Sequence, residues 1–318
     1  MDRRQFLEAS AMATVWASTT SLVSIARSDE KAGDQASSAG MHLRYAINIG
    51  THFTNHPVLD RLQKVADFGF TAVENNGLPD LDRVAGSNEP NYDAIALYGQ
   101  KLKELGMTQA TWVTNGCAGK CNCSITDDSG TAEFLRRVHH TTKISPLVAG
   151  TISTVTSGIE VPKLSSKEMT QNVITALKKA AEIVEKAGGP VLVLEPLNVL
   201  VDHPGYHVVK TDHAAEIIDA VGSPKVKILY DIYHQQISEG NLIGNIRKHY
   251  DRIGYFQFGD HPGRHEPFTG EIHYPNVFKA IYQLGYQGMV GGEYGPAGGG
   301  NDDASIASMK AVRLADQW

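Results

Sequence analysis

Four residues with an oxygen-bearing side chain each end a short run of apolar or β-branched residues and precede a turn or loop. They are Glu195, Asp231, Gln257 and Glu293. Neighbours in this set are separated by roughly one strand–helix–strand repeat, so each is expected at the carboxyl end of a different parallel strand. Those ends form one rim of an α/β barrel, where barrel enzymes carry their chemistry. We therefore expect the four side chains to converge.

Three carboxylates and one amide oxygen on a single rim would repel one another unless a hard cation lay between them. Oxygen ligands favour Mg²⁺ or Mn²⁺ over Zn²⁺, which prefers nitrogen and sulfur. A structural salt bridge would explain any one of the acids, but it does not explain the whole set on successive strand ends. The sequence thus predicts a divalent metal, Mg²⁺ or Mn²⁺, held by Glu195, Asp231, Gln257 and Glu293.

Residues suited to bind a keto acid or a polyol follow these strand ends. His234 comes shortly after Asp231, and Arg264 lies in a loop rich in proline and glycine after Gln257. An arginine can hold a carboxylate through two parallel hydrogen bonds. The alternative for Arg264 is an arginine on a surface loop. We expect His234 and Arg264 to bind the substrate.

Two further acids each have two roles open to them. Glu74 ends another expected strand and either supports the metal ligands or is a structural acid. Glu271 either fixes the loop that carries Arg264 or caps the following helix. The loop after Glu195 adds candidates for the pocket wall, with loop packing as the alternative for each histidine: Asn198, His203, Tyr206 and His207.

The elements that must position these residues alternate regularly from Met41 onward. Short runs rich in β-branched residues predict strands over 43–49, 71–74, 107–114, 151–156, 190–195, 226–231, 252–258 and 288–293. Between them, apolar residues at helical spacing predict helices over 57–68, 91–105, 130–145, 167–187, 211–221, 241–250, 275–284 and 302–315. This alternation implies an α/β fold with a parallel sheet, and its regularity favours a closed TM-type (β/α)8 arrangement, the TIM barrel, over an open sheet.

Segments around these positions resemble the hydroxypyruvate isomerase family. They are 194–198, 203–206, 230–235 and, above all, 259–275, which carries Arg264. The likeness is strong from about residue 191 to 297 and weaker over 43–156. It implies a xylose-isomerase-like TIM barrel with the metal ligands predicted above. It also implies that Glu195 and Glu293 are the catalytic proton donor and acceptor, and that His234 and Arg264 contact the substrate.

The resemblance implies a metal-dependent isomerase that interconverts hydroxypyruvate and 2-hydroxy-3-oxopropanoate (tartronate semialdehyde) through an enediolate. Two alternatives stay open: a ketose 3-epimerase or inosose-type dehydratase or isomerase acting on a free sugar or polyol, and a non-catalytic exported sugar-binding barrel. Epimerases of this group usually carry histidine where this chain has Gln257, which favours the isomerase. The unusual first strand end, residues 48–53, leaves the substrate open.

The first residues are expected to precede the barrel domain, which we assign to 41–318. Arg3 and Arg4, followed by Phe6 and Leu7, resemble a twin-arginine export signal, which we assign to residues 1–26, although Asp2 and Glu8 depart from its usual pattern. Residues 27–40 are small and polar and are expected to form a linker. Export to the periplasm follows from this assignment; a disordered or amphipathic tail is the alternative.

The composition limits the partners. The chain has 318 residues, a formal net charge of −6 and no basic stripe, so nucleic acid is not an expected partner. No apolar run is long enough to span a membrane. A homo-oligomer is possible, with no feature that defines an interface.

All three cysteines lie in one loop, at Cys117, Cys121 and Cys123. A zinc site there is disfavoured because no fourth ligand lies nearby. A local disulfide with one thiol left over and a fully reduced loop both stay open.

Overall fold

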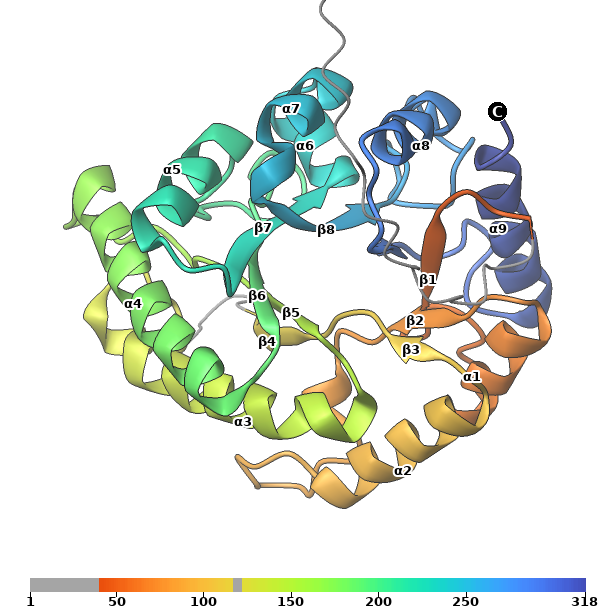
Figure 1. Cartoon of the computed structure of the whole chain (residues 1–318), viewed down its shortest axis with the longest axis horizontal. Coiled ribbons are helices and arrows are strands. Elements are labelled where there is room, and N and C mark those ends of the chain that lie inside the picture. Colours follow the sequence, from red (N-terminus) through yellow and green to blue (C-terminus); the bar gives the residue numbers. More distant parts are fainter. Residues whose placement is uncertain (1–39, 117–121) are drawn as a thin grey trace, which may run out of the picture. The chain divides into compact units, whose positions relative to one another are not determined.

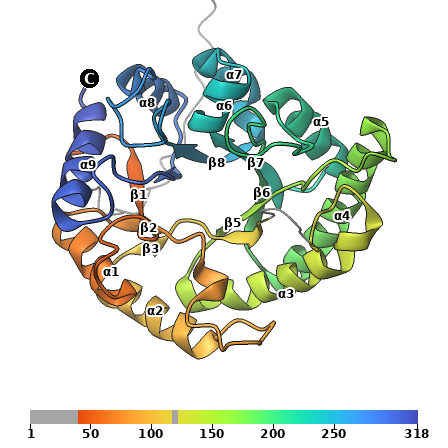
Figure 2. The ribbon, with the colours of Figure 1, turned by 180° about the vertical axis from the view of Figure 1, so that it is seen from behind.

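The computed structural model describes residues 40–116 and 122–318. The predicted signal, almost all of the linker, Cys117 and Cys121 therefore lie outside the described residues. Within the described part, parallel strands form one sheet that curls into a ring, with helices on its outside (Figure 1). Figure 2 shows the same ring from behind, with the helices again outside the strands. This is the α/β TIM-barrel architecture expected from the sequence.

The strands are β1 (Arg44–Asn48), β2 (Ala72–Glu74), β3 (Thr108–Gln109), β4 (Val113–Asn115), β5 (Ile152–Val155), β6 (Val191–Leu194), β7 (Val226–Asp231), β8 (Ile253–Phe258) and β9 (Met289–Gly292). Their order in the sheet is β3-β2-β1-β9-β8-β7-β6-β5-β4. The helices are α1 (Val58–Asp67), α2 (Tyr92–Glu104), α3 (Thr131–Val148), α4 (Ser166–Ala187), α5 (Thr211–Val221), α6 (Ile232–Ser238), α7 (Leu242–His249), α8 (Tyr274–Gln283) and α9 (Asp302–Ala315), with short 3₁₀ turns at Leu78–Asp80, Asp128–Gly130 and Tyr250–Arg252.

The third predicted strand, 107–114, is interrupted, and this corrects the sequence prediction. Its two pieces, β3 and β4, stand at opposite ends of the sheet order. The residues between them still bond to both neighbours. The backbone N–H of Ala110 donates to the carbonyl of Val73, and that of Thr154 donates to the carbonyl of Trp112, both at 2.8 Å. One segment thus pairs with β2 on one side and with β5 on the other, and this closes the barrel.

Helix α6 is a second difference from the prediction, which placed no helix between Asp231 and residue 241. The Oδ1 atom of Asp231 accepts a hydrogen bond from the backbone N–H of Tyr233 at 2.9 Å and so caps this helix directly at the strand end. Aspartate is a strong helix N-cap. Oδ1 of this predicted metal ligand is therefore used in capping α6, and Oδ2 stays available to bind a metal.

The outer helices bury amphipathic faces against the strands. Helix α4 begins with a capping box in which the Ser165 and Glu168 side chains bond to each other's backbone N–H groups. It buries residues such as Val173, Leu177 and Val184 at helical spacing. It ends at Gly188, whose φ of 62° lies in the left-handed region that glycine adopts without strain. A rigid shell of this kind fixes the strand ends that carry the candidate site.

Candidate active site

The candidate site is the layer of side chains inside the barrel that lies at the carboxyl ends of the strands. A small buried cluster fills the layer beneath it, with members from six of the strands and from the segment joining β3 to β4: Ala46, Ala72, Ala110, Val193, Leu229, Tyr255 and Met289. Side chains of a strand alternate between its two faces, so residues two positions further on point to the same side. Those positions include Glu74, Glu195, Asp231 and Gln257, and Glu293 lies four positions after Met289. The alternation places the predicted residues together.

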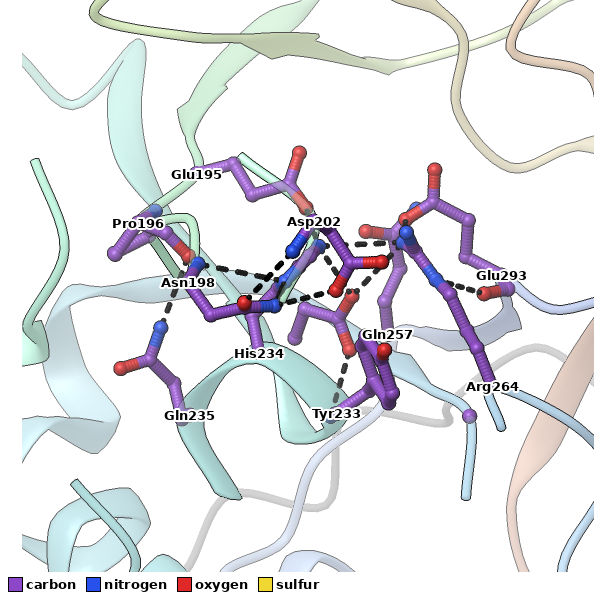
Figure 3. A network of polar contacts seen from close by, with 12 residues as sticks. Glu195, Pro196, Asn198, Asp202, Tyr233, His234, Gln235, Gln257, Arg264 and Glu293 are labelled. Atoms are coloured by element: carbon purple, nitrogen blue, oxygen red, sulfur yellow. Dashed lines mark hydrogen bonds and ion pairs between the residues drawn. The ribbon is translucent and has the colours of Figure 1, made fainter. Parts of the chain in front are cut away.

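Ligand atoms of Glu195, Asp231, His234 and Glu293 all lie within 4.8 Å of one another. These residues lie at or just beyond the ends of β6, β7 and β9 and at the start of α6, and Figure 3 shows Glu195, His234 and Glu293 gathered around Arg264. Gln257 is the register partner of Asp231 across β7 and β8, so its side chain belongs to the same layer. The structure therefore brings the predicted ligand residues to one place, with His234 beside them.

Three buried oxygens at this point find no hydrogen-bond partner among the described residues. They are Glu195 Oε1, Asp231 Oδ2 and Gln257 Oε1. Leaving a buried acceptor unpaired costs free energy, so such groups in a native structure call for a partner. Three oxygens from three different strands fit a hard cation such as Mg²⁺ or Mn²⁺. The residues present are thus suited to hold the metal predicted from the sequence.

Burial and mutual repulsion raise the pKa of two of these acids, Glu195 and Asp231. Burial raises the pKa of Glu195 well above its ordinary value, and the nearby charges of Glu293 and Asp231 raise it further. Burial likewise raises the pKa of Asp231 to about 7, although the positive charge of Arg264 opposes the shift. A buried carboxyl with a raised pKa is suited to general acid–base work.

His234 is fully buried and is held in one tautomer. Its Nδ1 accepts a hydrogen bond from Nδ2 of Asn198 at 2.6 Å, so the ring proton is on Nε2, and the approach of Arg264 Nη2 to Nε2 at 3.2 Å is then a contact between two donors. Asn198 is oriented in turn because its Oδ1 accepts from the backbone N–H groups of Val201 and Asp202. Burial, helped by the charge of Arg264, lowers the pKa of His234 well below its usual range. A neutral imidazole thus points an N–H at the site, with Nε2 3.5 Å from Asp231 Oδ2.

Arg264 reaches into the site, so the alternative of an ordinary surface-loop arginine does not describe it. Its Nη2 donates to Glu293 Oε2 at 2.8 Å and lies 3.6 Å from Asp231 Oδ2. The guanidinium carbon lies 4.9 Å from the ring centroid of Tyr233, as in a cation–π contact. Burial lowers the pKa of Arg264, but the carboxylates of Glu293, Asp231 and Glu195 outweigh it and raise the pKa overall.

Asn76 is a site residue that the sequence reasoning missed. Its Nδ2 donates to Glu293 Oε1 at 2.5 Å, so Asn76 and Arg264 hold the two oxygens of the same carboxylate. The signal was present, because Asn76 follows the polar residues Glu74 and Asn75 at the end of β2. A polar residue just beyond a barrel strand is a candidate for the rim.

Glu74 and Glu271, the two acids whose roles the sequence left open, lie in different surroundings. Glu74 is fully buried and accepts a hydrogen bond from the side-chain amide of Gln257, so it contacts a predicted metal ligand. Burial, followed by the charge of Glu293, raises the pKa of Glu74 well above its ordinary value. Glu271 is exposed and accepts from Gln236 Nε2 at 3.0 Å. It does not cap α8, because the side chain of His273 does so.

Among the loop candidates, three residues belong to the site. His203 and Tyr206 line a pocket of about 340 Å³ together with Glu195, His234 and Arg264. Asn198 acts on His234 as described above. His207 lies elsewhere, with Nε2 3.0 Å from the hydroxyl of Thr170.

The contact between Arg264 and Glu293 borders two cavities. Besides the pocket over Glu195 and His234, a second one of about 360 Å³ is lined by Asn48, Asn76, Arg264 and Glu293, among others. A third cavity, of about 270 Å³, adjoins the first through Val113 and Gly116. The rim thus offers room on both sides of the guanidinium.

The first strand end lines the second cavity through Asn48, Gly50 and Thr51, and Gly116, which precedes the cysteine loop, borders the first. His52, in the unusual segment 48–53, turns away to Ser308, whose hydroxyl lies 3.0 Å from Nε2. Cys123 is buried, and burial raises the pKa of its thiol. Cys117 and Cys121 lie outside the described residues, so the redox state of the loop stays a prediction. Among the residues described, no helix is long and apolar enough to cross a membrane.

The chain is similar to known proteins in both sequence and fold. Residues 62–313 match the model of the xylose isomerase-like TIM barrel family. The chain is 32% identical over 263 residues to the hydroxypyruvate isomerase of Escherichia coli (strain K12), covering 80% of this chain and 94% of that enzyme. It is 31% identical over 259 residues to a 2-oxo-tetronate isomerase of Pectobacterium atrosepticum, covering 80% and 93%. A solved structure from Brucella melitensis, titled AP endonuclease, family 2, matches with a TM-score of 0.73 at 27% identity, covering 86% of this chain and 98% of that chain.

Proposed function

This chain is an isomerase that belongs to the xylose isomerase-like TIM barrel family, and on that premise we propose that it interconverts hydroxypyruvate and 2-hydroxy-3-oxopropanoate. The observation that carries the proposal is the convergence of Glu195 and Glu293 with Asp231, in a site where buried oxygens have no hydrogen-bond partner among the described residues and a guanidinium lies beside them. Two carboxyls can move a proton between adjacent carbons, and the guanidinium can bind the carboxylate of a short keto acid.

Glu195, Asp231, Gln257 and Glu293 would hold the divalent cation, Mg²⁺ or Mn²⁺. When bound there, such a cation supplies electrostatic stabilisation of negative charge on the substrate's neighbouring oxygens. The support on the protein side is the set of unpaired oxygens on Glu195, Asp231 and Gln257.

The chain's own residues account for the proton transfers. One of Glu195 and Glu293 removes a proton from C3 of hydroxypyruvate, and the electron pair of that C–H bond forms the C2–C3 double bond of an enediolate. The other glutamate delivers a proton to C2, while the C3 hydroxyl loses its proton and the C2 oxygen gains one. C3 is oxidised and C2 is reduced, so no external oxidant is needed. The neutral His234 donates from Nε2 to a substrate oxygen, and Arg264 binds the carboxylate.

Proton exchange measured by NMR in D₂O tests this proposal. Protein supplied with Mn²⁺ or Mg²⁺ should incorporate deuterium into hydroxypyruvate and form the aldehyde product. Glu195→Gln and Glu293→Gln should each lower turnover by at least about 10³-fold, because a proton carrier is removed. Full turnover in either variant would contradict the proposal. Asp219→Asn, an exposed acid paired with Arg252, is the control for the loss of one negative charge.

A second candidate is a four-carbon substrate. The 2-oxo-tetronate isomerase relative is almost as similar as the hydroxypyruvate isomerase relative. The cavities on both sides of Arg264 also leave room for an extra hydroxymethylene group. The same NMR assay with 2-oxo-tetronate decides between the two, since the better substrate has the higher kcat/KM. Ketoses and inosose-type polyols in the same panel test the epimerase and dehydratase alternatives, and exchange with no compound would favour the non-catalytic barrel.

We also propose that residues 1–26 direct export through the twin-arginine route, on the basis of the Arg3–Arg4 pair. Replacing both arginines by lysine should leave the protein in the cytoplasmic fraction of a bacterial host. Periplasmic recovery of that variant would contradict the assignment.

A further inference from the structure

We propose that Glu74 is a positioning residue that determines which end of the Gln257 side-chain amide faces the metal. This inference rests on the metal site proposed above. Glu74 closes β2 and is completely buried, while Gln257 lies on β8, far away in the sequence. β1 and β9 lie between these two strands in the sheet, so the contact depends on the curl of the sheet into a barrel.

The contacts of Glu74 leave one end of the amide unused. Its Oε1 accepts a hydrogen bond from Nε2 of Gln257, and its Oε2 accepts one from the hydroxyl of Tyr255 at 3.4 Å. The other end of the amide, Gln257 Oε1, is buried without a hydrogen-bond partner in the described part of the chain. The donor end is therefore fixed on Glu74 and the acceptor end is left for a cation.

An amide can present either its oxygen or its NH₂ group, and only the oxygen binds Mg²⁺ or Mn²⁺. An acceptor behind the amide removes this ambiguity, because it forces the NH₂ group backward. Glu74 can accept from Gln257 in both of its protonation states. In the acid form Oε1 still accepts from Gln257, and the proton on Oε2 faces Tyr255.

The barrel makes room for this pair. A Cβ atom at Gly291 would lie 1.9 Å from Glu74 Oε2 and 2.4 Å from the hydroxyl oxygen of Tyr255. Gly291 is also the register partner of Gln257 across β8 and β9. The sequence thus places its smallest residue on the strand face where the Glu74 carboxyl needs space.

Three variants of Glu74 separate positioning from a role of its charge. In Glu74→Met no acceptor remains behind Gln257. The Mn²⁺ affinity should then fall by about 10–100-fold, the usual loss when a residue that hydrogen-bonds to a metal ligand is replaced. Glu74→Asp keeps the charge but withdraws it by one methylene, so the same direction of change is expected. Glu74→Gln should keep affinity within about 3-fold, because its carbonyl still accepts from Gln257 and its NH₂ group can donate to Tyr255.

Mn²⁺ binding by the full chain, measured by electron paramagnetic resonance and by titration calorimetry, is the readout, with folding checked by circular dichroism. A double-mutant cycle with Gln257→Met adds a second test. If Glu74 acts through Gln257, Glu74→Met should cost nothing further once Gln257 is replaced. Asp219→Asn is the control for the removal of an acid far from the site.

If Glu74→Met and Glu74→Asp both keep the Mn²⁺ affinity of the unaltered protein, the role of Glu74 is overturned, whereas the proposed metal site is not. A loss in Glu74→Gln as large as in Glu74→Met would also overturn that role, because charge rather than hydrogen-bond acceptance would then be the cause. Additive losses in the double-mutant cycle would do the same. If the unaltered protein binds no Mn²⁺, the proposed metal site fails, and this inference fails with it.

Discussion

The guanidinium of Arg264 holds Glu293 at two points: Nη2 lies 2.8 Å from the carboxylate oxygen Oε2, and Nε lies 3.1 Å from the backbone carbonyl oxygen. The residue expected to bind the substrate's carboxylate thus contacts one of the two proposed proton carriers. This relationship links substrate binding to the position of a catalytic carboxyl.

Arg264→Lys tests this link. Lysine keeps the charge, but it cannot bond through two nitrogens or stack on Tyr233 in the same way. A hydrogen bond to a charged group contributes about 1.5–3 kcal/mol, so kcat/KM should fall by about 10–100-fold. Steady-state kinetics checks this. Arg252→Lys, whose arginine pairs with Asp219 on the surface, is the control and should leave kcat/KM unchanged.

The tautomer of His234 can be inverted by exchanging an amide and an acid. In Asn198→Asp with Asp202→Asn, a carboxylate at 198 would accept from Nδ1–H, which leaves Nε2 without its proton. Because the exchange keeps the donors and acceptors between 198 and 202 complementary, the fold should persist. We expect kcat to fall by about 100-fold or more, by analogy with other sites whose histidine tautomer is reversed.

Asp202→Asn alone is the control for this experiment. The amide of Asn198 still donates to His234, so kcat should stay within about 3-fold of the unaltered protein. A double variant as active as this control would show that the tautomer has no role. The pH profile of kcat supplies a second readout, since loss of fold would not shift it.

His52 makes stability depend on pH. Burial lowers the pKa of His52 from 6.5 to about 4. Between about pH 4 and pH 6.5, His52 is therefore protonated in the unfolded chain and neutral in the folded chain. Its contribution is complete above pH 6.5 and is lost as the pH falls toward 4. The unfolding free energy of the protein relative to His52→Gln should therefore fall by about 2 kcal/mol from pH 7 to pH 5.

Urea denaturation at several pH values measures this difference. Comparing the protein with its variant cancels the site carboxyls, whose raised pKa values act in the opposite direction. His139→Gln, at an exposed position on α3, is the control for the substitution itself. A pH-independent difference for His52→Gln would contradict the prediction.

The packing of α2 on α3 depends on Gly99. A Cβ atom there would lie 1.9 Å from the carbonyl oxygen of Leu147, which is backbone and moves only with its helix. Gly99→Ala should lower the unfolding free energy by about 1–3 kcal/mol, despite the better helix propensity of alanine. Gly77→Ala, where the nearest atom would be 3.8 Å away, is the control for the substitution itself. Equal stability of the two variants would contradict the prediction.

Several parts of the fold were predictable because they depend on local patterns. Helices such as α4 followed from apolar residues at helical spacing together with a cap and a terminal glycine. Helix α6 was missed because it is short and begins directly at the end of β7, with no polar linker between the two elements to mark its start. The break between β3 and β4 was missed because a run of strand-forming residues gives no sign of where its pairing partner changes.

The sequence by itself determined which residues point into the barrel, because side-chain alternation along Glu195, Asp231 and Gln257 is a property of each strand alone. Only the tertiary structure decided the contacts between elements: Glu74 with Gln257, Asn76 with Glu293, and Arg264 with Glu293. These pairs are far apart in the chain, and their distances are set by barrel closure and by the paths of the loops. The physical reason is that a local pattern fixes only which face of a strand a side chain points to. A hydrogen bond also requires a suitable donor–acceptor distance and suitable angles at both groups.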